Sequence, residues 1–116
     1  MLASSGNLFD AEQGNPDREV VTLILETPDL KIERIVSLGQ HSPPGFWYDQ
    51  SWSELVMLLA GSAGLCFEGE SAVRILKPGD YVLIPAHQKH RVEWTSQSHP
   101  AIWLAIHFPT PDEADT

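Results

Sequence analysis

The fold is best read from the twelve residues Gly79-Asp80-Tyr81-Val82-Leu83-Ile84-Pro85-Ala86-His87-Gln88-Lys89-His90. Pro78 and Gly79 suit the two central positions of a type II turn, since proline presets φ and glycine adopts a positive φ. The apolar run after the turn predicts a strand, and Pro85 ends it. Two histidines follow, and histidine is the commonest metal ligand in proteins. The stretch therefore indicates both a β architecture and a candidate site.

Short apolar strands separated by turn residues fill the rest of the chain. We expect them at residues 20–25, 31–38, 55–60, 64–68, 72–76, 81–84, 90–95 and 102–108. Gly69 and Glu70 fit a two-residue type II′ hairpin. No long stretch has a clean helical period, so the chain is predicted to be all-β, a sandwich or a barrel.

Composition narrows the class of protein. The 116 residues are predicted to form one domain over 18–111, after a polar N-terminal arm (1–17) and before an acidic tail (112–116). A net charge of −9 disfavours nucleic acid and anionic membrane as partners. The single cysteine, Cys66, excludes an internal disulfide and suits a reducing compartment. No signal peptide or membrane span is recognisable, and a cytoplasmic location is expected.

Two motifs resemble those of the cupins. Gly79, five residues, Pro85 and then His90 resemble the second cupin motif. Glu54, six residues and Gly61 resemble the end of the first, whose full form begins with a His-x-His pair. The resemblance runs over most of the chain and implies a double-stranded β-helix (jelly-roll) barrel with a central pocket. In its metal-binding members, three histidines and one glutamate hold a divalent ion.

Carried over by position, Glu54 takes the glutamate place and His90 that of the second-motif histidine. The His-x-His places depend on the gap before Glu54. They fall on Trp47 and Asp49 with a four-residue gap, and on Tyr48 and Gln50 with a three-residue gap. Neither choice gives a histidine, which is where this chain departs from the family.

A compensated metal site can be assembled from Asp49, Glu54, His87 and His90. Strand alternation points Glu54 and His90 inward, and carboxylates with imidazoles suit zinc, iron, manganese or nickel. Plainer interpretations stand beside this one. In these, Glu54 forms a simple salt bridge with Arg34 or Arg74, His90 is a satisfied core histidine, and Asp49 forms an Asx-type turn within its loop. His87 is a metal ligand, a rim acid or base, or an exposed turn residue. His107 either lines the barrel or lies on its other face.

Four aromatic residues are candidates to line a pocket for a flat, apolar ligand: Trp47, Tyr48, Trp52 and Trp94. An interpretation of equal weight is that these residues close the mouth of the barrel or form a dimer contact. Tyr48 and His87 are the candidates for proton transfer. On the strand face opposite Glu54 stand Leu55, Met57 and Leu59. A second subunit or the N-terminal arm is expected to cover them, and a homodimer is predicted.

The sequence thus predicts a small metal-binding cupin that binds or transforms a small organic molecule in its pocket. The alternative is a metal-free cupin that binds a ligand or serves as a structural module without catalysis. Fold-level resemblance does not select the reaction, because cupins host many chemistries and also non-enzymatic binders.

Overall fold

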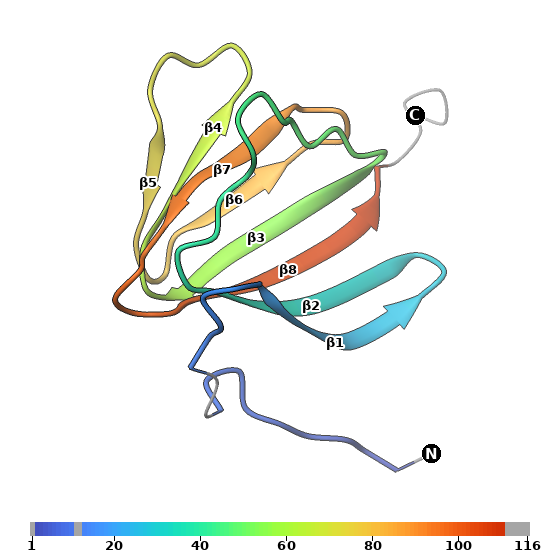
Figure 1. Cartoon of the computed structure of the whole chain (residues 1–116). Helices are drawn as coiled ribbons and strands as arrows, with labels where there is room; N and C mark the ends of the chain where they lie inside the picture. The colour runs from blue at the N-terminus through green and yellow to red at the C-terminus, as the bar shows by residue number, and fades with distance from the viewer. Residues whose placement is uncertain (1, 11–12, 111–116) are drawn as a thin grey trace.

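The computed structural model describes residues 2–10 and 13–110, which form eight strands and no helix (Figure 1). The strands are β1 (Val20–Thr27), β2 (Leu30–Ser37), β3 (Trp52–Ala60), β4 (Ala63–Phe67), β5 (Arg74–Leu76), β6 (Tyr81–Ile84), β7 (His90–Thr95) and β8 (Ala101–Pro109). All eight predicted strands are present, and the all-β jelly-roll prediction is confirmed. The predicted acidic tail lies outside the described residues.

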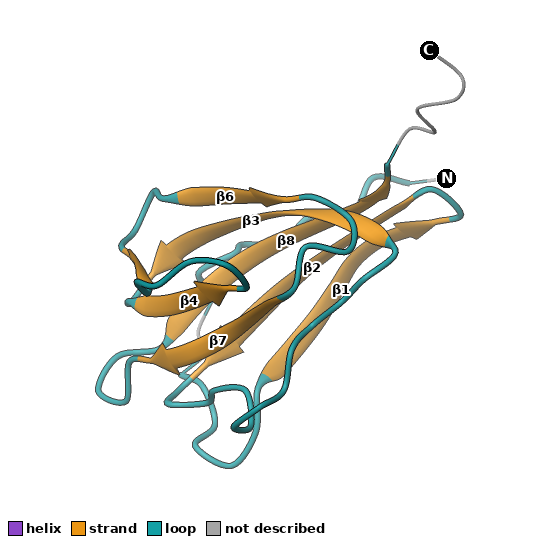
Figure 2. Ribbon diagram, turned by 90° about the horizontal axis from the view of Figure 1, so that it is seen from above, coloured by secondary structure: helices purple, strands orange, loops and turns teal. Residues whose placement is uncertain are grey.

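The strands form two layers, which Figure 2 shows from above. A five-stranded sheet has the order β1-β2-β8-β3-β6, and a three-stranded sheet has the order β5-β4-β7. Every pairing is antiparallel. Apolar residues on the facing surfaces of the two sheets form the core, including Leu58 and Trp103 on one and Leu65 and Phe67 on the other. The wider sheet extends beyond the narrower one at its β1 edge.

The turn before β6 has the predicted type II form. Gly79 has a φ of 95°, and the Asp80 amide donates to the Lys77 carbonyl over 3.0 Å. The Asp80 carboxylate also accepts from the Lys77 amide over 2.9 Å. The Gly79 amide donates to the Leu58 carbonyl over 2.8 Å, and the Leu58 amide donates to the Asp80 carbonyl over 2.9 Å. These bonds from the turn to β3 fix the register of β6, in which Ile84 stands opposite Glu54.

The predicted type II′ hairpin at Gly69 and Glu70 is wrong. Strand β5 begins only at Arg74, and residues 68–73 connect it to β4. Within this connection the Glu70 amide donates to the Phe67 carbonyl, with Gly69 at a φ of 92°. An ion pair of 2.6 Å between Glu70 and Arg74 spans the loop. The glycine therefore serves a turn inside a longer loop.

A β-bulge in β7 changes which residues face inward. Leu65 pairs with Val92, but the next residue of β4, Gly64, pairs with Trp94, so Glu93 is the extra residue. A bulge of one residue reverses the alternation of side chains beyond it. Trp94 therefore shares the outer face with Gly64, whose missing Cβ leaves room for the indole. Trp94 is predicted to line the pocket, and this prediction is wrong because the bulge places its side chain on the outer face.

The loop between β2 and β3 runs along β7 and widens the smaller sheet. Tyr48 and His90 exchange two backbone hydrogen bonds of 2.7 and 3.1 Å. Further along, the Ser42 amide donates to the Val92 carbonyl over 2.8 Å, and the Val92 amide donates to the Ser42 hydroxyl. The loop thus becomes a fixed wall of the space between the sheets.

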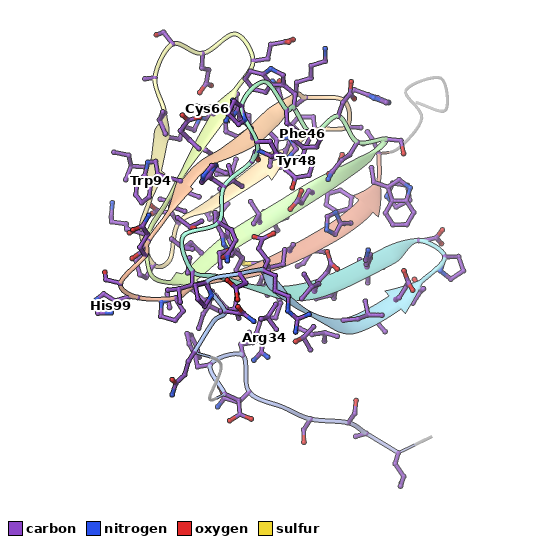
Figure 3. The ribbon with its side chains drawn as sticks, in the orientation of Figure 1. Arg34, Phe46, Tyr48, Cys66, Trp94 and His99 are labelled. Atoms are coloured by element: carbon purple, nitrogen blue, oxygen red, sulfur yellow. The ribbon has the colours of Figure 1, made fainter. Side chains whose placement is uncertain are left out.

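The N-terminal arm is held by Arg34 on the outer face of β2 (Figure 3). The guanidinium donates to the carbonyls of Asn7 and Leu8 over 3.3 Å each. Farther along β3 and β6, the outer face keeps exposed apolar side chains, with Leu83 58% and Tyr81 71% exposed. The arm contact lies on β2 and not on the β3 face of Leu55, Met57 and Leu59, so the predicted cover of that face, by the arm or in a homodimer, stays a prediction. The described residues contain no helix able to cross a membrane.

Candidate functional site

A cavity of about 260 Å³ lies between the two sheets, next to the loop that runs along β7. Its wall is apolar over much of its area, from Ile35, Val56, Leu65, Ile84, Val92 and Trp103. Its polar lining consists of three glutamates, three histidines and a few uncharged groups. The carboxylates and imidazoles are those of Glu19, Glu33, Glu54, His41, His90 and His107. An apolar pocket with few convergent polar groups is the usual form of a small-molecule site.

Glu54 and His90 face each other across the cavity from β3 and β7. The His90 Nε2 lies 3.9 Å from a Glu54 carboxylate oxygen, and both side chains are almost entirely buried. The His90 Nδ1 lies 2.9 Å from the Gln88 carbonyl, which can only accept, so Nδ1 carries a hydrogen. In the neutral ring Nε2 is then unprotonated and faces the Glu54 carboxyl group.

Burial raises the pKa of the Glu54 carboxyl group above its ordinary value. The imidazoles of His107 and His90 act in the opposite direction, and the Glu33 carboxylate adds to the rise. His107 stands directly opposite Glu54 in the pairing of β3 with β8. A carboxyl group with a raised pKa exchanges protons more readily near neutral pH than an exposed glutamate does.

Glu33 and His107 form a second pair beside the first. The His107 Nε2 donates to a Glu33 carboxylate oxygen over 3.2 Å, and both side chains are largely buried. On its other oxygen Glu33 approaches the Lys31 ammonium at 3.6 Å. Glu33 thus has two partners, which places its charge in a compensated setting and holds the His107 ring beside Glu54.

Tyr48 and Gln50 also line the cavity, from the loop before β3. The Tyr48 ring stacks on the His90 imidazole, with centroids 5.4 Å apart. Burial, and then the carboxylates of Glu19 and Glu54, raise the pKa of the Tyr48 phenol. The phenol therefore keeps its proton and is suited to donating a hydrogen bond to a ligand.

Asp49 and His87, two of the predicted metal ligands, form a pair outside this lining. The His87 Nδ1 lies 2.8 Å from an Asp49 carboxylate oxygen, and the His87 side chain is 69% exposed. The His87 backbone has a φ of 65°, and its amide donates to the Gln50 carbonyl over 2.7 Å. The pair fastens the turn after β6 to the loop before β3, and the structure does not bring it together with Glu54 and His90.

The four predicted pocket aromatics are also separated. Tyr48 lines the cavity, whereas Trp47, Trp52 and Trp94 are absent from its described lining. Trp94 is turned outward by the bulge, and Trp52 opens β3 opposite Pro109. Trp103 is the tryptophan in the cavity wall, and its indole donates to the Ser37 hydroxyl over 3.3 Å.

Known proteins share this architecture. The cupin domain profile matches residues 36–107, more than half of the chain. The chain belongs to the cupin family. Among curated proteins, none matches this cupin.

Solved structures resemble this cupin over most of its length. One is a protein from Ralstonia eutropha JMP134, described as a putative mannose-6-phosphate isomerase. It is 47% identical, has a TM-score of 0.90, and the match covers 93% of this chain and 100% of that one. A Methanocaldococcus jannaschii cupin with a double-stranded β-helix fold is 17% identical, with a TM-score of 0.73 and coverage of 100% and 99%. A Desulfitobacterium hafniense cupin superfamily protein is 16% identical, with a TM-score of 0.71 and coverage of 85% and 84%.

The cavity settles which gap applies before Glu54. With the three-residue gap, the four family ligand positions are Tyr48, Gln50, Glu54 and His90, and all four line the cavity. Two of the three expected imidazoles are therefore replaced by a phenol that retains its proton and by a neutral amide, both poor ligands for zinc or iron. Among residues 2–10 and 13–110, no three His, Cys, Asp or Glu side chains are placed to hold a metal ion. The residues do not fit the four-ligand centre of the family. The presence and identity of a metal stay predictions, which the metal content of the purified cupin will decide.

Of the charged and imidazole side chains in the lining, Glu19, Glu33 and His41 are not among the site residues that the sequence predicts, and His107, which the sequence leaves between two faces, lines the cavity. Alternation along β2 and β8 places Glu33 and His107 on the same face as Ile35 and Trp103, and this signal was present in the sequence. Glu19 comes from the segment before β1, and its carboxylate accepts from the Ser37 hydroxyl over 2.7 Å. No local sequence pattern predicts that Glu19 lines the cavity, because its position depends on how the N-terminal arm packs against β2.

Proposed function

We propose that this cupin binds a small organic molecule in the cavity between its sheets and exchanges a proton with it through Glu54. The observation that carries the proposal is the placement of the buried Glu54 carboxyl group between the imidazoles of His90 and His107, in a cavity whose remaining walls are largely apolar. Such a group is costly to bury unless a ligand or a shared proton satisfies it. Sites of acid–base chemistry are where perturbed carboxyl groups gather.

The neighbouring residues have separate tasks in this proposal. Glu54 accepts a proton from the ligand or returns one, and His90 holds the proton in turn because its Nε2 faces the carboxyl group. The Tyr48 phenol donates a hydrogen bond to an oxygen atom on the ligand, where negative charge develops. His107, oriented by Glu33, steadies the Glu54 carboxylate once it has lost its proton.

The cavity walls supply the binding energy. Burial of an apolar ligand surface contributes about 25 cal/mol for each Å² removed from water. A cavity of about 260 Å³ lies just under the range typical of drug-sized ligands, so the proposed ligand has the size of a small metabolite. The same walls exclude water from Glu54 when the ligand is bound, which strengthens the electrostatic effects of the site.

Binding is tested by NMR with cyclohexanol, a small uncharged probe. We expect the largest shifts of backbone amide resonances at cavity residues such as Val56 and Trp103. The substitution Val92→Phe, which fills the cavity, should abolish these shifts. Ile75→Phe, on an exposed position of β5, is the matched control and should leave them unchanged. Shifts that map elsewhere would remove the binding part of the proposal.

The proton-exchange part is tested by titration of the glutamate side chains with carbon-13 NMR. Glu54 should titrate at a higher pH than Glu26, which is exposed on β1 and lies outside the cavity. Substitution of His90 by alanine should raise the Glu54 titration point further, since it removes an imidazole that lowers the pKa. Equal titration of Glu54 and Glu26 would contradict the assigned role.

A further inference from the structure

We propose that the cavity selects small organic molecules that carry a protonated amine and rejects phosphorylated ones. This inference rests on the proposed function and names the ligand class of the same site. It differs from what the description of the 47% identical relative would suggest, which names a sugar phosphate.

The charges around the cavity are the first argument. Three carboxylates line it, from Glu19, Glu33 and Glu54, and within the described lining there is no lysine or arginine. Lys31 approaches Glu33 from outside the lining, with its side chain 41% exposed. A phosphate dianion is ordinarily bound by arginine, lysine or the amides of a helix N-terminus. The described cavity offers none of these and would place the dianion beside three carboxylates.

The second argument is that the three carboxylates are not equally satisfied. Glu33 has the His107 imidazole and Lys31, and Glu19 has the Ser37 hydroxyl. Glu54 makes no hydrogen bond with any part of the chain that the structure describes. Its one ion-pair contact among the described residues is with the His90 Nε2, at 3.9 Å, although only 12% of its side chain is exposed. A buried carboxylate without a donor leaves a place for one to be brought by the ligand.

An ammonium group supplies what Glu54 lacks. It carries a positive charge and three N–H donors, so it can bond Glu54 and still reach a second acceptor. The raised pKa of Glu54 also indicates that its carboxylate lacks a compensating partner, because the effect of burial outweighs the lowering effect of the two imidazoles. A bound cation would lower that pKa and stabilise the carboxylate, so ligand binding and proton release are coupled.

The walls fit the rest of such a molecule. Tyr48 also lines the cavity, and its phenol, which keeps its proton, can donate a hydrogen bond to a second polar group of the ligand. Ile35, Val56 and Leu65 offer an apolar surface for a hydrocarbon body. The structure therefore describes a site for an amphipathic amine, with its charged end toward Glu54.

Three probes with the same ring and different head groups test the inference: cyclohexylammonium, cyclohexanol and cyclohexyl phosphate. Affinities are measured at pH 7 by calorimetry, and the binding site is mapped by amide shifts in NMR. A charge-assisted hydrogen bond to Glu54 should make the ammonium bind about tenfold or more tightly than the alcohol. The phosphate should produce no shifts at cavity residues at concentrations where the alcohol does.

The variant Glu54→Gln should bring the ammonium to within about threefold of the alcohol, since it removes the charge and keeps the shape. The matched control is Glu26→Gln, which changes the net charge equally at an exposed position and should preserve the preference. Tighter cavity binding of the alcohol or the phosphate than of the ammonium overturns the inference alone. Failure of all three probes to shift cavity resonances overturns both this inference and the proposed function.

Discussion

Replacement of Glu54 by glutamine should make the protein more stable at neutral pH. In the native state the carboxyl group is buried and its pKa is raised, so ionisation is unfavourable compared with that in the unfolded chain. Glutamine has nearly the same shape and no charge to desolvate. The variant therefore removes the cost of ionising Glu54 and keeps the packing of β3 against β6 and β8.

The pH dependence follows from the direction of the shift. The ordinary glutamate pKa is 4.5, and the native value lies above it. Between the two values the native state binds more protons than the unfolded state, so wild-type stability falls as the pH rises through this window. Below the window the two proteins should be equally stable. Above it the variant should keep a constant advantage.

The size of that advantage is set by the elevation of the pKa. Each unit contributes about 1.4 kcal/mol, and for a domain of this length 1 kcal/mol corresponds to roughly 3–6 °C in Tm. Urea and thermal unfolding of both proteins between pH 4 and pH 8 measure the difference directly. Glu26→Gln, on the exposed β1 position, should show no comparable trend.

One outcome would refute the reasoning. If Glu54→Gln is less stable than wild type at neutral pH by about 3 kcal/mol or more, the carboxylate must be well paired in the native state. The His90 contact at 3.9 Å would then be a true buried ion pair or part of a filled metal site. In either case Glu54 would not be the unsatisfied group on which the proposed ligand class depends.

Three other variants probe the surroundings of the site. Tyr48→His combined with Gln50→His should create a metal site together with Glu54 and His90. Zinc at about a hundred times its Kd should then raise Tm by roughly 10 °C. An unchanged Tm would contradict the inferred ligand positions. His87→Gly places a residue without a Cβ at a φ of 65° and removes the exposed pair with Asp49. The free energy of unfolding should change by less than about 1 kcal/mol, and the affinity for cyclohexylammonium by less than about twofold. A large loss of affinity would place His87 in the site. Leu83→Asp, on the exposed apolar face, should turn a dimer into a monomer in sedimentation experiments, and a wild-type protein that already sediments as a monomer would disprove the homodimer.

The fold was largely predictable because its signals are local. The Pro78-Gly79 turn, the apolar run to Ile84 and the alternation in β2 depend on neighbouring residues, and each is found where it was expected. The two motifs that resemble those of the cupins added the jelly-roll barrel as the expected arrangement of these strands. Strand ends were less predictable, since β3 begins at Trp52 and β5 only at Arg74.

The site was predicted in part, because its geometry depends on contacts between distant segments. Glu54 and His90 do meet, as the motifs implied. Asp49 does not join them, since the three-residue gap turns Tyr48 and Gln50 to the cavity instead. The bulge in β7 could not be read from the sequence either, although it decides where Trp94 points.

The strands of the barrel and the loop before β3 contribute different residues to the cavity, and this difference affects how such a protein evolves. Glu54, His107 and Glu33 stand on paired strands, where any shift in register would disturb the whole sheet. Tyr48 and Gln50 stand on a loop held mainly through its backbone. Side chains on that loop can be exchanged at little cost to folding. A new ligand preference can therefore arise there while the buried Glu54 carboxyl group is inherited unaltered.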